Sequence, residues 1–447
     1  MALDSSLKTA PAMTPPLPPR SSRFVDSPLA HEAFRAIWLA AIFSNVGTFV
    51  QDVGESWLML SLTHDALPVA MLTTAFTVPA FLLMMPAGVL ADRWDRRRIL
   101  LVAQSLQTAS AFVLALTTWR GWTTPAVLLV SSAGLGIGSA LSSPAWNSII
   151  PELVPRKLTA EAVTLNSVAF NIARAVGPAL GGLVLAAYGP GMAFFLNALS
   201  FLAVIEVLRR YTAFKEASAR ALAVARKRRG ESIRRALFAA VHVVRKTESL
   251  RTPHLAVAAF GLAAASVPAL LSLFAKNVLG ASAAGYGMML GAIGVGAVTG
   301  AVLLKRWRST MHPRAVIGGA MAMYGVAALA MSTTRSLPVA VLLLLPAGVG
   351  WIASLSSLNA LVQLAAPPHL KSRVLALYQV AFLASWSVGS AIGGAVANDI
   401  GVARTLTLAA TCVLAAAAWS SRLALPSWDT QPVASDPLAT PLPASVR

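Results

Sequence analysis

An otherwise apolar run near the N-terminus carries two acids, Asp52 and Glu55, about one helical turn apart. On a helix they share a face with Asn45 and Thr48, and Gln51 lies beside them. A carboxylate inside a membrane-spanning helix is costly unless it faces water or a partner, so it is a functional candidate. Two neighbouring acids also repel each other when both are ionised, which suits groups that take up and release protons. We therefore predict proton coupling at the two acids, with the other three residues lining a cavity.

Depth distinguishes the two acids. If the helix begins near Ile37, a rise of 1.5 Å per residue puts Asp52 about 22 Å in and Glu55 nearer the outer surface. Asp52 is accordingly predicted to be the better-buried proton site, with a static ion-pair role as the alternative. For Glu55 the alternative is a hydrated acid in an outer vestibule.

Arg174 is a basic residue deep in another apolar segment, where it shares a helix face with Asn171. Because arginine keeps its proton, it requires a carboxylate, an anionic substrate or water. Pairing with Asp52 would let protonation of the acid release the arginine for substrate. A permanent structural ion pair is the alternative, and both remain open. Tyr378 and Trp386 are further cavity candidates, since they would supply a hydroxyl and an aromatic wall.

The composition of the chain indicates where these residues lie. Apolar residues make up 56% and charged residues 12% of the chain, and the mean hydropathy is +0.68, a balance typical of polytopic membrane proteins. Each crossing needs about 20 apolar residues, and long apolar runs without a barrel's alternation indicate helices. Twelve segments qualify, centred near Val46, Thr77, Ala109, Gly136, Ile172, Leu199, Ala264, Gly294, Met323, Gly350, Trp386 and Val413.

Basic residues are distributed unequally between the two sides that these segments define. The net charge is +19, yet the loops assigned to the outer side contain only Arg120, Lys276, Arg335 and Arg404. The positive-inside rule then puts both termini in the cytoplasm of a protein that crosses the bacterial inner membrane many times. A charge distribution set by topology argues against a nucleic-acid partner.

The segments divide the chain into units. Residues 1–34 form a proline-rich tail that we expect to be disordered and cytoplasmic, and residues 424–447 have the same character. Six segments occupy 35–210 and six occupy 253–423, joined by a basic linker at 211–252.

The linker has its own pattern. Ile233, Leu237, Val241 and Val244 recur at helical spacing among basic residues, which predicts an amphipathic helix on the lipids of the inner leaflet. A site for a regulatory partner is the alternative. The single cysteine, Cys412, lies in the last segment and excludes an intramolecular disulfide.

The two sets of segments repeat each other. Residues 168–182 and 380–394 share eight identities in fifteen at an offset of 212, and an upstream register at 214 pairs Gly136 with Gly350. We therefore predict an all-α membrane protein with twelve transmembrane helices in two pseudo-symmetric six-helix bundles.

The loop after the second segment reads GVLADRWDRRR. It resembles the G-x-L-x-D-R-x-G-R-R motif of the major facilitator superfamily, and the resemblance extends over roughly residues 30–423. Asp95 stands where that family usually has glycine. Within the superfamily, the runs NIARAVGPALGG and AFFLNALSFLAVI are most similar to the branch of enterobactin exporters and macrolide efflux proteins. The residues that match the loop motif are Gly88, Leu90, Asp92, Arg93, Arg96 and Arg97.

The resemblance implies a conformational latch in this loop. Asp92, with Arg93 beside it, would hold the cytoplasmic side shut near Arg373 in the outward-facing state. For Arg97 a purely topological role is expected.

A second motif lies in the fifth segment, where residues match the G-P-x-x-G-G core of proton-coupled antiporters in the resembled family. They are Gly177, Pro178, Gly181 and Gly182. Glycines at four-residue spacing permit close helix contact in lipid. The eighth segment offers a complementary surface at Gly287, Gly291, Gly296 and Gly300. We expect the fifth and eighth segments to pack together; the direction of export rests on the resemblance alone.

These patterns predict a secondary active transporter that exchanges protons for an amphipathic small molecule, siderophore or drug-like, by alternating access. Uptake by the same fold is the nearer alternative, and a membrane-embedded lipid-modifying enzyme the more distant one. The sequence offers no metal-ligand set, nucleophile elbow or phosphate-cradling loop for an enzyme or a cofactor, and we expect the histidines in tails and loops. No pattern in the sequence encodes the oligomeric state, and we expect a monomer.

Overall fold

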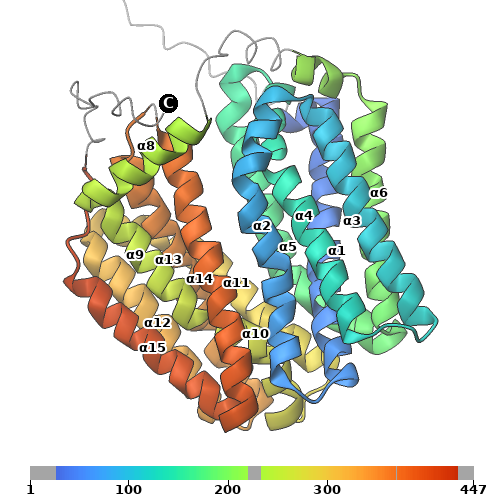
Figure 1. The fold of residues 1–447 in the computed structure, drawn as a ribbon, viewed down its shortest axis with the longest axis vertical. Coiled ribbons are helices and arrows are strands. Elements are labelled where there is room, and N and C mark those ends of the chain that lie inside the picture. Colours follow the sequence, from blue (N-terminus) through green and yellow to red (C-terminus); the bar gives the residue numbers. More distant parts are fainter. Residues whose placement is uncertain (1–26, 220–232, 369, 431–447) are drawn as a thin grey trace, which may run out of the picture.

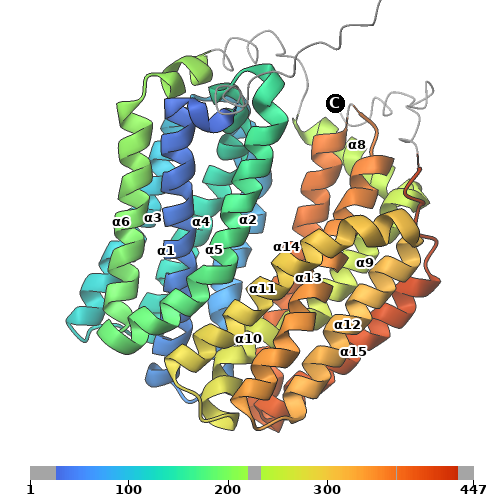
Figure 2. The ribbon, with the colours of Figure 1, turned by 180° about the vertical axis from the view of Figure 1, so that it is seen from behind.

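The computed structural model describes residues 27–219, 233–368 and 370–430. Within these ranges the secondary structure is helical, and twelve spans are long and apolar enough to cross a membrane, as predicted. Figures 1 and 2 show the helices gathered into two bundles that lie side by side. Most of the predicted N-terminal tail, residues 220–232 of the linker and the last residues lie outside the described ranges.

The first bundle is built from α1 to α6. Proline at the first position begins α4 and α6, where a missing N–H costs nothing, and Gly189 joins α5 to α6 at a positive φ of 77°. The helices are α1 (Glu32–Leu62), α2 (Ala66–Arg93), α3 (Arg96–Trp119), α4 (Pro125–Ile149), α5 (Thr159–Tyr188) and α6 (Pro190–Arg210).

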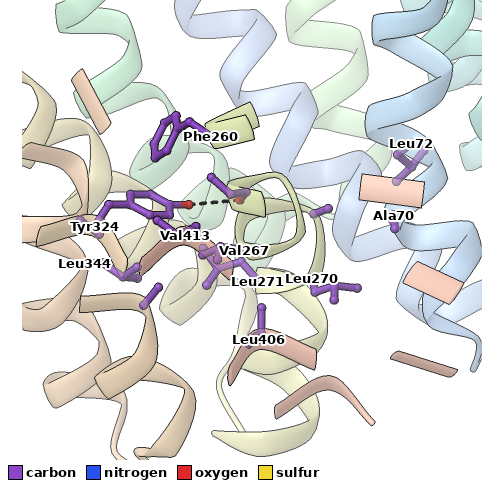
Figure 3. Packing of buried hydrophobic residues seen from close by; sticks show 14 of the residues in the cluster. Ala70, Leu72, Phe260, Val267, Leu270, Leu271, Tyr324, Leu344, Leu406 and Val413 are labelled. Carbon is purple, nitrogen blue, oxygen red and sulfur yellow. Dashed lines mark hydrogen bonds between the residues drawn. The ribbon is translucent and has the colours of Figure 1, made fainter. Parts of the chain in front are cut away.

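The second bundle starts with a broken span. Pro268 has no N–H to donate to the Ala264 carbonyl, so α9 (Glu248–Ala264) gives way to α10 (Ser266–Leu273) and a π-helical turn (Phe274–Val278). Tyr324 donates its hydroxyl to that carbonyl at 3.3 Å (Figure 3). The remaining helices are α11 (Ala283–Thr310), α12 (Pro313–Thr333), α13 (Leu337–Ala365), α14 (Lys371–Ile400) and α15 (Val402–Arg422).

The two bundles repeat each other's helix contacts. In the first, α1 packs on α5 and α6 while α4 packs on α2 and α3; in the second, α9 packs on α14 and α15 while α13 packs on α11 and α12. Gly136 of α4 lies against the Phe76 backbone of α2, and Gly348 of α13 lies against the Ile293 backbone of α11. Gly136 thus corresponds to Gly348 and not to Gly350. The offset of 212 holds here as well, and the expected offset of 214 is wrong.

The two ends of the molecule differ. At one end α8 (Ile233–Lys246) lies against α9 and α14, which confirms the predicted helix in the linker; we call this the linker end. At the opposite end, the contact end, Lys276 Nζ donates to the Leu60 carbonyl at 3.2 Å. Buried apolar packing there is continuous between the bundles, since Leu72 of α2 belongs to the same core as Val267 and Leu270 of α10 (Figure 3).

The segment after α15 is ordered further than expected. Thr252 donates to the Ala424 carbonyl at 3.2 Å, Leu425 is buried, and Trp428 Nε1 donates to the Met311 carbonyl at 2.9 Å. Residues 424–430 therefore pack on the linker end of the second bundle, and the prediction of a disordered tail from 424 is wrong for this part.

Candidate functional site

A chain of hydrogen-bonded side chains runs through the interior of the first bundle. Glu55 accepts from Gln51 Nε2 at 2.7 Å on one oxygen and from Ser132 Oγ at 2.5 Å on the other. Asn197 Nδ2 donates to Gln51 Oε1 at 2.7 Å, and Ser200 Oγ donates to Asn197 Oδ1 at 3.0 Å. The chain joins α1, α4 and α6, and each of its side chains is buried.

Glu55 is thus held in a fully bonded interior position, with 6% of its surface exposed. Asp52, three residues earlier, is exposed. The expected order, with Asp52 the better buried and Glu55 in an outer vestibule, is therefore wrong. Gln51 also lies in the interior, at 0% exposure, and does not line a cavity in this conformation.

Helix geometry explains why the polar residues predicted to share one face of α1 point in different directions. Gln51 and Glu55 are four residues apart, so they lie almost above one another on the side of α1 that faces α4 and α6. Asp52 is rotated from Glu55 by about 60° around the helix, which takes its carboxylate out of the bundle interior. Tyr286 of α11, in the other bundle, lies close to Asp52 and stacks on Trp57 at 6.2 Å.

Asn45 and Thr48 are partly exposed, on the same side of α1 as Asp52. The Thr48 hydroxyl donates to the Ser44 carbonyl at 3.0 Å, one turn back. Such a back-bond satisfies the hydroxyl within its own helix, and it leaves the Thr48 oxygen able to accept a further hydrogen bond.

Arg174 is half-buried on α5, with its guanidinium carbon 5.0 Å from the centre of the Phe170 ring. Asn171, on the same face, donates to the Ser167 carbonyl at 2.8 Å. Among the described residues, the ion pairs formed within 4.0 Å do not include Arg174 with Asp52. The predicted pairing is therefore not made in this conformation.

The register of α1 against α5 explains why Arg174 and Asp52 do not form an ion pair. Phe49 of α1 faces Gly177 of α5, and both helices run in the same direction. Arg174 precedes Gly177 by three residues, whereas Asp52 follows Phe49 by three, so about 9 Å of helix rise separates the two charges. Direct contact would require most of the length of both side chains.

Aromatic rings gather inside the second bundle. Trp351 and Trp386 meet edge to face at 4.9 Å, and Phe382 lies 5.6 Å from Trp386 and 5.9 Å from Trp351. Trp386, the predicted aromatic, is half-buried in this cluster. Trp351 and Phe382 were not foreseen, because only the placement of α13 beside α14 brings their rings together.

Tyr378 belongs to packing in this conformation, contrary to its expected place in a cavity wall. It is 3% exposed, donates its hydroxyl to the Leu355 carbonyl at 3.1 Å, and meets the His254 ring edge to face at 5.9 Å. His254 itself is buried in α9, with Nδ1 2.7 Å from the Leu250 carbonyl. The expectation that the histidines lie in tails and loops is wrong for this residue.

The predicted contact between the fifth and eighth segments is confirmed by the packing of α5 on α11. A Cβ built on Gly287 would lie 2.6 Å from the Pro178 carbonyl and 3.0 Å from the Gly182 Cα, so the two backbones touch. Gly294 approaches Ala175 in the same way. Small residues thus let helices of different bundles meet.

The other glycines of the two motifs have different neighbours. Gly177 and Gly181 face α1, at Phe49 and Val53, so they stabilise the first bundle rather than the contact between bundles. On α11, close approaches at two glycines are made to α13; these are Gly296 and Gly300. The expectation that they face the fifth segment is wrong.

A second contact between the bundles joins α2 to α14. Thr74 donates to the Ser387 carbonyl at 3.1 Å and lies 3.0 Å from Ser390 Oγ, while Asn398 Oδ1 accepts from the Ala66 amide at 2.6 Å. These bonds lie toward the contact end, away from the loop that joins α2 to α3. In Figures 1 and 2 the ribbons of the two bundles diverge toward the linker end.

The loop between α2 and α3 is tied to its own bundle. Arg96 pairs with Glu152 at 2.8 Å, and Arg97 Nε donates to the Leu208 carbonyl at 2.7 Å. Asp95 accepts from the Arg97 and Arg98 amides and so caps the N-terminus of α3. This cap explains an acid at a position where the resembled family usually has glycine.

The predicted latch is only partly visible. The side chains of Asp92 and Arg93 lie outside the described part of the chain. Gly88 has open space around it, since a Cβ there would meet no atom within 4 Å.

Two pseudo-symmetric six-helix bundles, with polar groups inside the first and glycine-lined contacts between them, are the architecture of a membrane transporter. The transmembrane secretion effector family matches residues 23–446, and the chain belongs to it. Its fold is that of major facilitator transporters. At 12% identity it resembles the nucleoside transporter NupG with a TM-score of 0.70, over 87% of this chain and 99% of that one. At 16% it resembles a D-xylose-proton symporter with a TM-score of 0.65, over 89% and 99%.

Relatives of known activity include efflux proteins. The chain is 27% identical to the multidrug efflux pump Tap of Mycolicibacterium fortuitum, over 83% of this chain and 90% of that protein. It is 28% identical to the enterobactin exporter EntS of Salmonella typhimurium, over 40% and 43%. It is 31% identical to the staphyloferrin A transporter of Staphylococcus aureus, over 36% and 41%. The matches to these two siderophore transporters thus span less than half of each protein.

Proposed function

We propose that this transporter exports an amphipathic small molecule, siderophore or drug-like, in exchange for protons by alternating access. The observation that carries the proposal is the position of Asp52. It is an exposed acid within a span, on the side of α1 that approaches Tyr286 of the other bundle. A carboxylate at that depth is stable when it is hydrated, paired or protonated, so its protonation state would respond to which side of the membrane reaches it.

Glu55 has a supporting part in this proposal. Its two oxygens are already occupied by Gln51 and Ser132, and this fixes the turn of α1 that carries Asp52. We assign to Glu55 the second proton-binding position. A proton would reach it when these hydrogen bonds rearrange, and not by direct hydration of the carboxylate.

The substrate would lie between Asp52, Arg174 and the aromatic cluster around Trp386. Rings and a guanidinium suit a molecule with both an apolar body and polar or anionic groups. The functions of two relatives, multidrug efflux for Tap and enterobactin export for EntS, support this class of substrate and the outward direction.

The orientation follows from charge. The linker end carries the basic loops and the ordered parts of both chain ends, so it would face the cytoplasm. In the opposite state of the cycle, Asp92 and Arg93 would latch this end shut near Arg373. The open space at Gly88 suits a surface that another helix approaches in that state.

Export can be tested in cells and then in vesicles. A host sensitive to efflux substrates, carrying the full chain, should tolerate a panel of amphipathic drugs and catecholate siderophores better than the same host without it. In proteoliposomes, movement of a protective compound should follow an imposed pH gradient and stop when a protonophore collapses it. Greater sensitivity of the host would instead favour uptake, and movement independent of the gradient would contradict proton exchange.

A further inference from the structure

A basic cavity of about 640 Å³ opens at the linker end of the second bundle, with a described lining from α11, α13, the start of α14 and the segment after α15. None of these lining residues is among those that the proposed function uses. Lys305 and Arg308 enter it from α11 and Lys371 from the start of α14, and Asn359 and Gln363 of α13 add amides. Among the described residues that line it there is no acid. Within the described residues, none of the three cations forms an ion pair.

The guanidinium in this cavity is held in place by neutral groups. Arg308 Nη2 donates to Ser356 and Ser357 hydroxyls at 3.2 and 3.3 Å, and its carbon lies 5.3 Å from the centre of the Trp428 ring. Trp428 is fixed in turn by its bond to the Met311 carbonyl. An arginine fixed in this way presents its remaining N–H groups in one orientation, a geometry suited to a tetrahedral or planar anion.

Comparison with the first bundle identifies a carboxylate that the cavity in the second bundle lacks. In the first bundle Arg96 occupies the space between the ends of α2 and α4, where it donates to the Ser148 carbonyl and pairs with Glu152. At the offset of 212 that aligns α4 with α13, Glu152 corresponds to Leu364 and Ser148 to Ala360, and both of these line the cavity. The first bundle thus supplies its own carboxylate at a place where the second has leucine.

We propose that this cavity binds a phosphate-bearing anion, which takes the place of the carboxylate that Glu152 provides in the first bundle. The three positive charges exceed what one carboxylate would neutralise. A phosphate group matches this charge, and its oxygens can accept from the surrounding hydroxyl and amide donors. The phosphate could belong to an anionic phospholipid headgroup or to a soluble phosphate compound. Basic pockets between helices near the cytoplasmic leaflet suit the first source.

The test measures thermal stability of the purified full chain in detergent, with added phosphatidylglycerol, phosphatidylcholine or inorganic phosphate. Stabilisation by phosphatidylglycerol but not phosphatidylcholine assigns the site to a headgroup, and stabilisation by inorganic phosphate assigns it to a soluble anion. The proposal is overturned if neither phosphatidylglycerol nor inorganic phosphate stabilises the protein. It is also overturned if both lipids stabilise it equally and phosphate does not. Lys305→Gln with Lys371→Gln should weaken anion binding about 25-fold, at roughly fivefold per lost cation. Arg306→Gln, an exposed neighbour outside the cavity lining, is the matched control and should bind like the wild type.

Leu364→Glu gives a second and independent readout. Leu364 is 37% exposed, so the change is tolerated by packing. It restores the acid of the first bundle, and the variant should be more stable than the wild type without added anion and should lose the stabilisation by anion. A Leu364→Glu chain that keeps the full anion effect would contradict the proposed site.

Discussion

Asp52 and Glu55 are three residues apart on one helix, yet Glu55 accepts two hydrogen bonds in the interior of the first bundle while Asp52 is exposed beside the second bundle. The pair combines a fixed acid with an accessible one. In the proposed cycle Asp52 is the directly accessible proton site, and Glu55 holds the helix that carries Asp52 and provides the second proton-binding position.

Glu55→Ala should destabilise the protein far more than Asp52→Ala. The change removes the acceptor for both Gln51 and Ser132, and each buried polar group left without a partner costs about 1–3 kcal/mol. Thermal unfolding of the purified variants measures the difference. Glu55→Gln keeps an acceptor oxygen and is the matched control, expected to lie between the two. Equal stability of the two alanine variants would argue against the interior hydrogen-bonded chain.

Gly287→Ala should weaken the contact between α5 and α11. The new methyl group would lie 2.6 Å from the Pro178 carbonyl, so one helix must shift, and overpacking of this kind costs about 1–3 kcal/mol. The same substitution at Gly319 of α12, which has no atom within 4 Å of the built Cβ, is the control. We expect slower transport and a lower melting temperature for Gly287→Ala only. The same behaviour in both variants would be inconsistent with close backbone contact here.

Sequence patterns sufficed for the spans and the repeat because bilayer thickness and glycine spacing leave strong periodic signals. Gly182, for example, is recognisable as a contact residue from its neighbours Gly177 and Gly181. Which helix each glycine meets is not encoded locally: Gly181 faces α1, whereas Gly182 faces α11. A rotation of about 100° per residue separates the two directions, and the assembled fold alone identifies each partner.

Asp95→Ala should cost about 1 kcal/mol, the typical value of a lost N-cap, because the Arg97 and Arg98 amides lose their acceptor. Asp95→Asn keeps a capping oxygen and should unfold close to the wild type. Urea or thermal unfolding compares the two. A similar loss in both would show that the charge of Asp95, and not its cap, is what stabilises the loop.

Asp92→Asn should slow transport while leaving stability almost unchanged, and it should do so more than Asp95→Asn. This prediction rests on the latch that the motif implies, in which Asp92 acts only when the linker end closes. Transport rates in proteoliposomes, measured beside unfolding curves, separate the two effects. Equal rates in both variants would remove Asp92 from the latch.

The site was less accessible to sequence reasoning than the fold. Counting rise along the first span gave the depth of Asp52 and Glu55 but not the direction in which each points. Exposure follows from rotation about the helix and from where α4 and α6 pack, and neither Ser132 nor Asn197 carries a signal that marks it as a partner of α1. The aromatic partner of Trp386 was hidden for the same reason, since Trp351 comes from a span that meets it only in the folded bundle.

The most direct test of proton exchange at Asp52 is gradient-driven transport by Asp52→Asn in proteoliposomes, compared with the wild type at equal protein content. The variant keeps the size and one acceptor oxygen of the side chain but cannot ionise, so transport driven by a pH gradient should fall to near the level of empty vesicles. Transport by Asp52→Asn that still responds to the gradient like the wild type would contradict the central claim.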